Sequence, residues 1–224
     1  MTATRPPQSS DPDEFGTVEF YASIGRGLVV MSGVILGLFA IELINWLTHQ
    51  RLNADGAIVT RVPSGLDGIL FAPLLHASWP HLYANSVPLL LTGTFVLAGG
   101  TTRFLSVTAI VALVSGLTVW FVGGPTGRPT VGASGVIFGY IGYLLMRGIV
   151  ERTWWTIGVA VLVGLLYGVA ISGVVPGDPQ VSWQGHLGGF VAGLLAAVLL
   201  RKRRVRPPTE PTKLPSTLTL PTLD

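Results

Sequence analysis

The stretch from residue 129 to residue 146, PTVGASGVIFGYIGYLLM, contains no Asp, Glu, Lys or Arg. Its length approaches the roughly 20 apolar residues that a helix needs to span a bilayer. Comparable stretches are Gly68–Thr102, Phe104–Gly127, Thr153–Gly177 and Pro179–Leu200. The stretch Gly27–Gln50 is similar but contains a single carboxylate. The sequence therefore predicts an all-α, polytopic membrane protein with six transmembrane helices, near residues 27–47, 81–100, 104–122, 132–148, 154–174 and 184–200.

The composition agrees with this class. Of the 224 residues, 49% are hydrophobic and only 11% are charged, which is too apolar for a soluble domain of this length. The pI near 9.6 does not indicate a nucleic-acid partner, because the basic residues lie at segment ends and in one cluster, residues 201–204. The absence of cysteine excludes disulfides, thiolate nucleophiles and cysteine-bound metals.

Three regions are expected along the chain. Residues 1–25 are polar, lack a signal-peptide pattern and are predicted to form a disordered cytoplasmic segment. Residues 26–204 form the six-helix membrane domain, and residues 205–224 form a disordered tail rich in Pro and Thr.

The basic residues also predict an orientation. Cytoplasmic loops of membrane proteins are enriched in Lys and Arg. If the N-terminus is cytoplasmic, the inside carries Arg26, Arg103, Arg147, Arg152, the 201–204 cluster and Arg206, and the outside carries Arg51, Arg61 and Arg128. This bias predicts a multi-pass protein of the cell membrane with both termini in the cytoplasm.

Polar side chains recur at one end of three predicted spans. His81 and Asn85 lie one helical turn apart in the second span, Ser134 lies near the start of the fourth, and His186 lies near the start of the sixth. All three ends face outward in the predicted orientation. Glycines follow Ser134 and His186 at intervals of four residues, a pattern that lets membrane helices pack closely.

These residue types suit covalent acyl transfer. Serine is a poor nucleophile unless a base takes its proton, and His186 is a candidate base for Ser134. His81 and Asn85 are candidate donors to the oxyanion of a tetrahedral intermediate. Each residue alone is better explained structurally, by a serine bonded to its own helix or a histidine at a helix end. Together, at one depth in a bilayer, they favour catalysis. His76 is interpreted as a histidine that anchors the preceding loop.

The segments HASWPHLYAN (76–85), GASG (132–135) and HLGGFVAG (186–193) resemble, in order and spacing, the rhomboid intramembrane serine proteases. The resemblance covers roughly residues 27–200. It implies a six-helix rhomboid-like bundle, a catalytic Ser134–His186 dyad without a carboxylate, and an oxyanion site at His81, Asn85 and the Ser134 amide. It further implies single-span membrane proteins as substrates, cleaved near the outer leaflet. The sequence calls for no cofactor and no metal.

The chain departs from this family at two places. A tyrosine that often stacks on the catalytic histidine is replaced by Phe138, which keeps the ring and loses the hydroxyl. A Trp-Arg pair often found in the first outer loop is absent between His49 and Ala72. Glu42 is the only carboxylate within a predicted span, and a structural role is favoured for it.

Other classes fit the sequence less well. A zinc protease needs a His-Glu-x-x-His helix, which the spacing of His76 and His81 does not provide. An aspartyl intramembrane protease needs two Asp residues inside the membrane, and the predicted spans contain none. A rhomboid-like protein that binds or sorts transmembrane clients without cleaving them stays open as the alternative. A small transporter is disfavoured because no inverted repeat is apparent.

Overall fold

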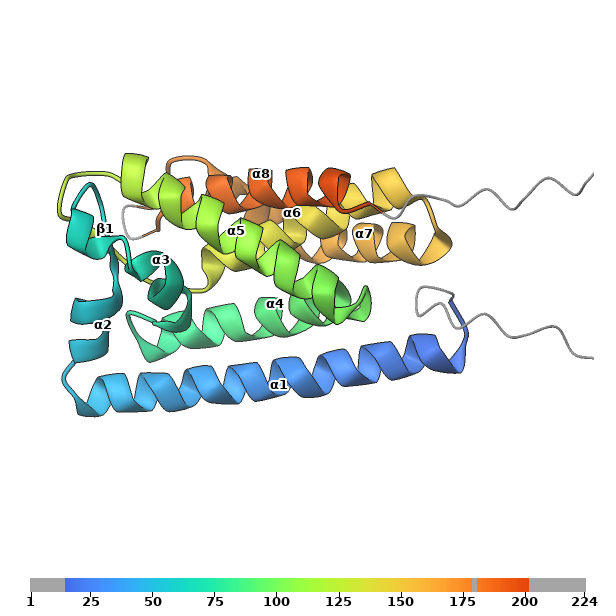
Figure 1. Cartoon of the computed structure of the whole chain (residues 1–224), viewed down its shortest axis with the longest axis horizontal. Helices are drawn as coiled ribbons and strands as arrows, with labels where there is room; N and C mark the ends of the chain where they lie inside the picture. Colours follow the sequence, from blue (N-terminus) through green and yellow to red (C-terminus); the bar gives the residue numbers. More distant parts are fainter. Residues whose placement is uncertain (1–14, 179–180, 202–224) are drawn as a thin grey trace, which may run out of the picture.

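The computed structural model describes residues 15–178 and 181–201. Six long helices lie side by side and run along a common direction (Figure 1). They are α1 (Val18–Leu47), α4 (Trp79–Ala98), α5 (Thr101–Val122), α6 (Ser134–Glu151), α7 (Trp154–Tyr167) and α8 (Trp183–Leu199). Their order and positions confirm the predicted helical bundle.

Hydrophobic side chains are exposed on the outside of the bundle, as expected for contact with lipid. Within the described residues, α1, α4 and α5 are long and apolar enough to cross a membrane by length and composition alone. The helices α7 and α8 are apolar but shorter, with 14 and 17 residues. The predicted fifth span continues to residue 174, but α7 ends at Tyr167 and a 3-10 segment, η3 (Val169–Val174), follows it.

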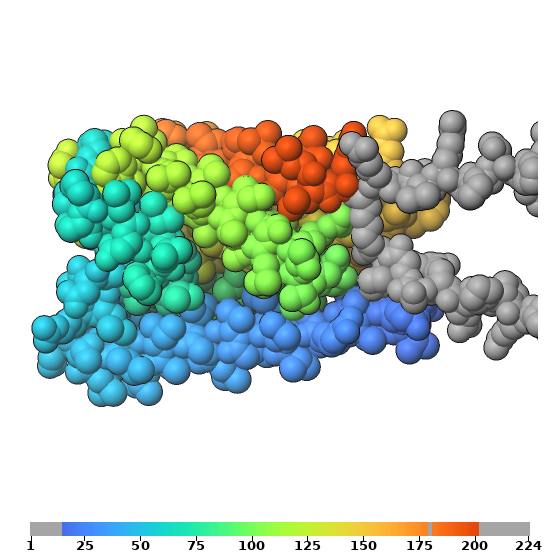
Figure 2. All heavy atoms as spheres, viewed as in Figure 1, coloured from blue at the N-terminus to red at the C-terminus, as the bar shows by residue number. Residues whose placement is uncertain are grey.

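The first helix begins earlier than predicted. It starts at Val18, where the hydroxyl of Thr17 accepts a hydrogen bond from the Phe20 amide at 3.1 Å. The prediction of disorder up to residue 25 is therefore wrong from residue 18 onward, because a Thr N-cap starts the helix before its apolar part. Figure 2 shows α1 along one side of the bundle, where it packs mainly on α4. The predictions for residues 1–14 and 205–224 lie outside the described residues.

The centre of the bundle is the contact between α6 and α8. A Cβ atom added to Gly189 would overlap the Gly135 carbonyl, and one added to Gly193 would overlap the Gly139 carbonyl. The two backbones are thus in direct contact, which only glycine permits at these positions. This close approach confirms the role predicted for the glycine pattern.

Short elements cover the end of the bundle at which α4, α6 and α8 begin, which we call the Ser134 end (Figure 1). They are α2 (Arg51–Gly56), β1 (Ile58–Val59), η1 (Pro63–Gly65), α3 (Gly68–Phe71), η2 (Ala72–Leu74) and β2 (Pro129–Thr130). The strands β1 and β2 pair antiparallel, with Ile58 opposite Thr130. This pairing, which the all-α prediction lacked, ties the first loop to the segment that enters α6.

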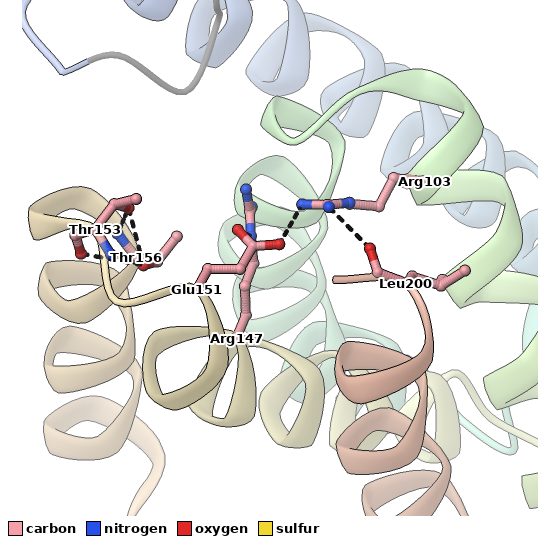
Figure 3. Close-up of polar contacts among 6 residues, drawn as sticks. All are labelled: Arg103, Arg147, Glu151, Thr153, Thr156 and Leu200. Carbon is pink, nitrogen blue, oxygen red and sulfur yellow. Dashed lines mark hydrogen bonds and ion pairs between the residues drawn. The ribbon is translucent and has the colours of Figure 1, made fainter. Parts of the chain in front are cut away.

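A buried ion cluster joins α5, α6 and the end of α8 at the opposite end of the bundle (Figure 3). Glu151 Oε1 lies 2.9 Å from Arg103 Nη1, and Glu151 Oε2 accepts a hydrogen bond from Arg147 Nε at 2.8 Å. Arg103 also donates to the Leu200 carbonyl at 2.9 Å, where α8 ends. The cluster therefore holds α5, α6 and α8 together at the end of the bundle that is distant from Ser134.

Candidate active site

Ser134 is the first residue of α6, and the segment before it is held on both sides. The Gly132 amide donates to the Ala72 carbonyl at 2.9 Å, and β2 pairs with β1. Gly132 has φ +128°, a conformation that residues with a Cβ rarely adopt. The serine therefore follows a sharp backbone turn, at a helix N-terminus where amide groups lack partners within the helix.

The structure brings Ser134 and His186 together across the α6–α8 contact. His186 Nε2 lies 2.8 Å from Ser134 Oγ, within hydrogen-bond distance. The two residues are 52 positions apart in the sequence, so the close packing of the two helices is what joins them. This is the distance that a nucleophile and its base require.

The other faces of His186 are also engaged. Its Nδ1 lies 3.1 Å from the Gly173 carbonyl of η3. The Phe138 ring stacks on the imidazole with 4.1 Å between ring centroids and 9° between planes, so the predicted stacking is present without a tyrosine hydroxyl. An imidazole held at two nitrogens and one face has little freedom to rotate away from the serine.

His81 and Asn85 flank the backbone just before Ser134. A Cβ atom on Gly132 would lie 2.7 Å from His81 Cε1 and 3.8 Å from Asn85 Nδ2. Asn85 is buried, and its Nδ2 has no hydrogen-bond partner among the described residues. Both side chains thus stand beside the turn that leads into the nucleophile.

A cavity of about 630 Å³ contains all four predicted site residues in its wall. Further wall residues come from α3, η2, α5 and the segment that precedes α8. A volume of this size is typical of sites that accept a small ligand or a short piece of chain. The candidate site is therefore a hollow at the Ser134 end with polar groups on several sides.

Two contributors to the site were not predicted from the sequence. Gly173 supplies only a backbone carbonyl, so no side-chain pattern could reveal it. Ser115 on α5 is buried and donates to the Gly185 carbonyl at 2.8 Å, next to His186. A lone serine in an apolar span is usually bonded to its own helix, and this one instead joins two helices.

His76 is fully buried just before α4, and its ring lies edge-on to His81 with centroids 5.2 Å apart. Its carbonyl accepts a hydrogen bond from Asn53 at 2.8 Å, which agrees with the predicted loop contact. Burial, and secondarily the positive charge of a protonated His81, lowers the pKa of His76 to about 4. The ring is therefore neutral at physiological pH.

Glu42 belongs to a different polar network. It is buried on α1, and its Oε2 accepts a hydrogen bond from Asn45 at 3.3 Å. Asn45 in turn bonds Gln50 and the amide of Asn53. The network joins the end of α1 to α2, in keeping with the structural role favoured for this carboxylate.

Comparison with known proteins agrees with this geometry. Residues 63–203 match the Rhomboid domain family. An uncharacterized protein of Mycobacterium tuberculosis is 42% identical over 183 residues, covering 78% of this chain and 75% of that protein. The fold and the match define a polytopic helical membrane protein. The chain belongs to the rhomboid family.

Two relatives carry names that state an activity. The rhomboid protease GluP of Bacillus subtilis is 34% identical over 176 residues, which cover 74% of this chain and 33% of that protein. A rhomboid-type serine protease 2 of Yarrowia lipolytica is 31% identical over 148 residues, covering 59% and 46% of the two chains. This chain therefore corresponds to less than half of either named protease.

Proposed function

We propose that this chain is an intramembrane serine endopeptidase in which Ser134 is the nucleophile and His186 is the general base. The observation that carries the proposal is the 2.8 Å separation of His186 Nε2 and Ser134 Oγ in a hollow at one end of a membrane bundle. The serine hydroxyl donates to the imidazole, which takes its proton as Oγ attacks the substrate carbonyl.

The negative charge that develops on the substrate oxygen needs hydrogen-bond donors. His81, Asn85 and the Ser134 amide are proposed to supply them, because the two side chains flank the turn that precedes Ser134. The protonated His186 then donates its proton to the leaving amine, which leaves an ester on Ser134. Attack by water, with His186 again acting as base, releases the acid and restores the serine.

The proposed substrates are single-span membrane proteins, cut in or near their transmembrane segment. A nucleophile at the end of a lipid-exposed bundle is accessible to a chain that is itself in the bilayer. The proposed orientation has both termini in the cytoplasm and the Ser134 end toward the outer face, because most of the basic residues in the described part of the chain lie at the opposite end.

The test is reconstitution of the purified chain in liposomes with a panel of single-span reporter proteins. Cleavage by the wild type and its loss in Ser134→Ala and His186→Ala, with folding intact, are the expected results. Ser86→Ala is the matched control, because within the described part of the chain the Ser86 hydroxyl bonds only the Leu82 carbonyl of its own helix, at 2.8 Å. Unchanged cleavage in Ser134→Ala would exclude this serine as the nucleophile.

The alternative is a rhomboid-like protein that binds or sorts transmembrane clients without cleaving them. Retention of both dyad residues within hydrogen-bond distance favours the enzyme. In the same liposomes, stable capture of the reporters without any cleavage by the wild type would support the alternative instead.

The orientation has a separate test, because the chain contains no cysteine. Ala54→Cys introduces a thiol at an exposed position of α2, and Thr102→Cys does so at the opposite end of the bundle. A membrane-impermeant maleimide added to intact cells is expected to label the first variant and not the second. The reverse pattern would overturn the proposed orientation.

A further inference from the structure

Among the described residues, no carboxylate bonds His186 in the way that the aspartate of a Ser-His-Asp triad orients its histidine, and a different group lies in that place. The Gly173 carbonyl lies 3.1 Å from His186 Nδ1, on the side of the ring away from Ser134. We propose that this carbonyl is the positioning group that holds His186 in the tautomer required of a general base. The inference rests on the proposed function and adds a further residue to the same site.

The chemistry of the imidazole makes this contact directional. A neutral imidazole carries one proton, so one ring nitrogen donates and the other accepts. A carbonyl oxygen can only accept, so the contact with Gly173 places the proton on Nδ1. The lone pair of Nε2 then faces Ser134 Oγ and is free to accept the hydroxyl proton. In a triad the carboxylate has this same effect on the tautomer.

The local packing leaves little room for a side chain at residue 173. A Cβ atom on residue 173 would lie 3.2 Å from Phe138 Cζ and 3.3 Å from His186 Nδ1. Contacts this short are tighter than ordinary van der Waals contact, so the two stacked rings or the backbone would have to give way. The absence of a side chain therefore allows the carbonyl to reach the imidazole while the ring keeps its stacking partner.

The segment that carries the carbonyl is held less firmly than the helices. No residue of η3 is buried, and the segment lies between the end of α7 and the connection to α8. Any displacement of η3 away from α8 removes the acceptor from Nδ1 and frees the other tautomer, in which Nε2 carries the proton and cannot accept one. The ability of His186 to accept the serine proton therefore depends on the contact between η3 and α8.

The first test is spectroscopic and does not require a substrate. The chain contains only four histidines, so labelling them with ¹⁵N gives a simple spectrum in which His186 is identified by its loss in His186→Gln. At a pH where the ring is neutral, we expect a single tautomer with the proton on Nδ1. A wild-type ring with its proton on Nε2, or an equal mixture of both forms, would overturn the proposal.

The second test perturbs the acceptor. Gly173→Ala is expected to give a mixture of tautomers and to lower kcat roughly tenfold or more, with KM little changed, since general base catalysis contributes about a hundredfold or more. Gly177→Ala is the matched control on the same connection, because a Cβ atom there meets no described residue within 4 Å. Equal spectra and equal kcat in the two variants would contradict the assignment.

Two further outcomes are distinguishable. Asp178 also lines the cavity and carries a carboxylate, so a tautomer change in Asp178→Asn that is absent in Gly173→Ala would assign the orienting role to Asp178 and overturn the proposal. If the wild type shows the Nδ1 proton and its loss in Gly173→Ala but cleaves no reporter, the protease assignment fails while the hydrogen bond to Gly173 stands.

Discussion

Replacing Gly132 by alanine tests whether His81 belongs to the oxyanion site, because the added side chain would press on its imidazole. The added Cβ would lie 2.7 Å from His81 Cε1 and 3.0 Å from its Nε2. Ordinary contact begins near 3.4 Å, so the imidazole must retreat by about 0.7 Å. A misplacement of about 1 Å costs on the order of a hundredfold in rate, so we expect a loss of this order in Gly132→Ala.

Backbone strain also contributes, because Gly132 has φ +128°. A side chain at such a φ costs about 1–3 kcal/mol of stability. Gly127 provides the matched control, since it lies in the same connection with φ +84° and a Cβ there meets none of the described residues within 4 Å. Gly127→Ala is therefore strained without touching His81.

The assay is the rate of labelling by a fluorophosphonate, which forms a tetrahedral adduct on an active serine, together with the rate of reporter cleavage. Thermal unfolding of both variants reports the strain. We expect similar losses of stability in the two variants and a large loss of rate only in Gly132→Ala. Equal rates in the two variants would refute the assignment of His81 to the oxyanion site.

Three further predictions concern stability and the base. Glu151→Gln removes the carboxylate that pairs with Arg147 and Arg103, whose side chains are 3% and 10% exposed, and is expected to destabilise the chain by about 3 kcal/mol. Asp55→Asn, in an ion pair whose side chains are 81% and 75% exposed, is expected to cost less than about 1 kcal/mol. Thermal unfolding checks both. Phe138→Leu removes the stacked ring and is expected to lower kcat several-fold with the fold intact, as reporter kinetics measure. The pKa of His76 is about 4 in the folded chain and 6.5 in the unfolded chain, so the unfolded chain binds the proton more readily. We therefore expect the free energy of unfolding to be greatest above pH 6.5 and to fall by up to about 3 kcal/mol as the pH drops toward 4. Unfolding measured across this range should show a weaker pH dependence in His76→Gln, and an identical dependence would contradict the prediction.

The arrangement of the helices could be predicted from the sequence because long stretches without charged residues mark the membrane spans. The same pattern misplaced two helix ends. Thr17 starts α1 ahead of its apolar part, through a cap that a hydropathy pattern does not register. The apolar run of the fifth span continues past Tyr167, although the α-helix ends there and a 3-10 segment follows, so composition alone gives no sign of the change.

The pairing of Ser134 with His186 was predictable because both carry distinctive side chains and glycines follow each of them. The rest of the site depends on backbone groups. Gly173 contributes a carbonyl, which every residue possesses, and its use depends on the path of η3 rather than on residue type. The pairing of β1 with β2 is likewise set by the packing of the loops, since two-residue strands have no periodicity to detect.

The proposed mechanism requires that Ser134 is a nucleophile activated by His186. The most direct measurement is mass spectrometric location of the adduct after the reconstituted chain reacts with a fluorophosphonate. We expect a phosphonyl group on the peptide that contains Ser134 and its absence in both Ser134→Ala and His186→Ala. An adduct on another serine, or undiminished labelling of Ser134 in His186→Ala, would contradict it.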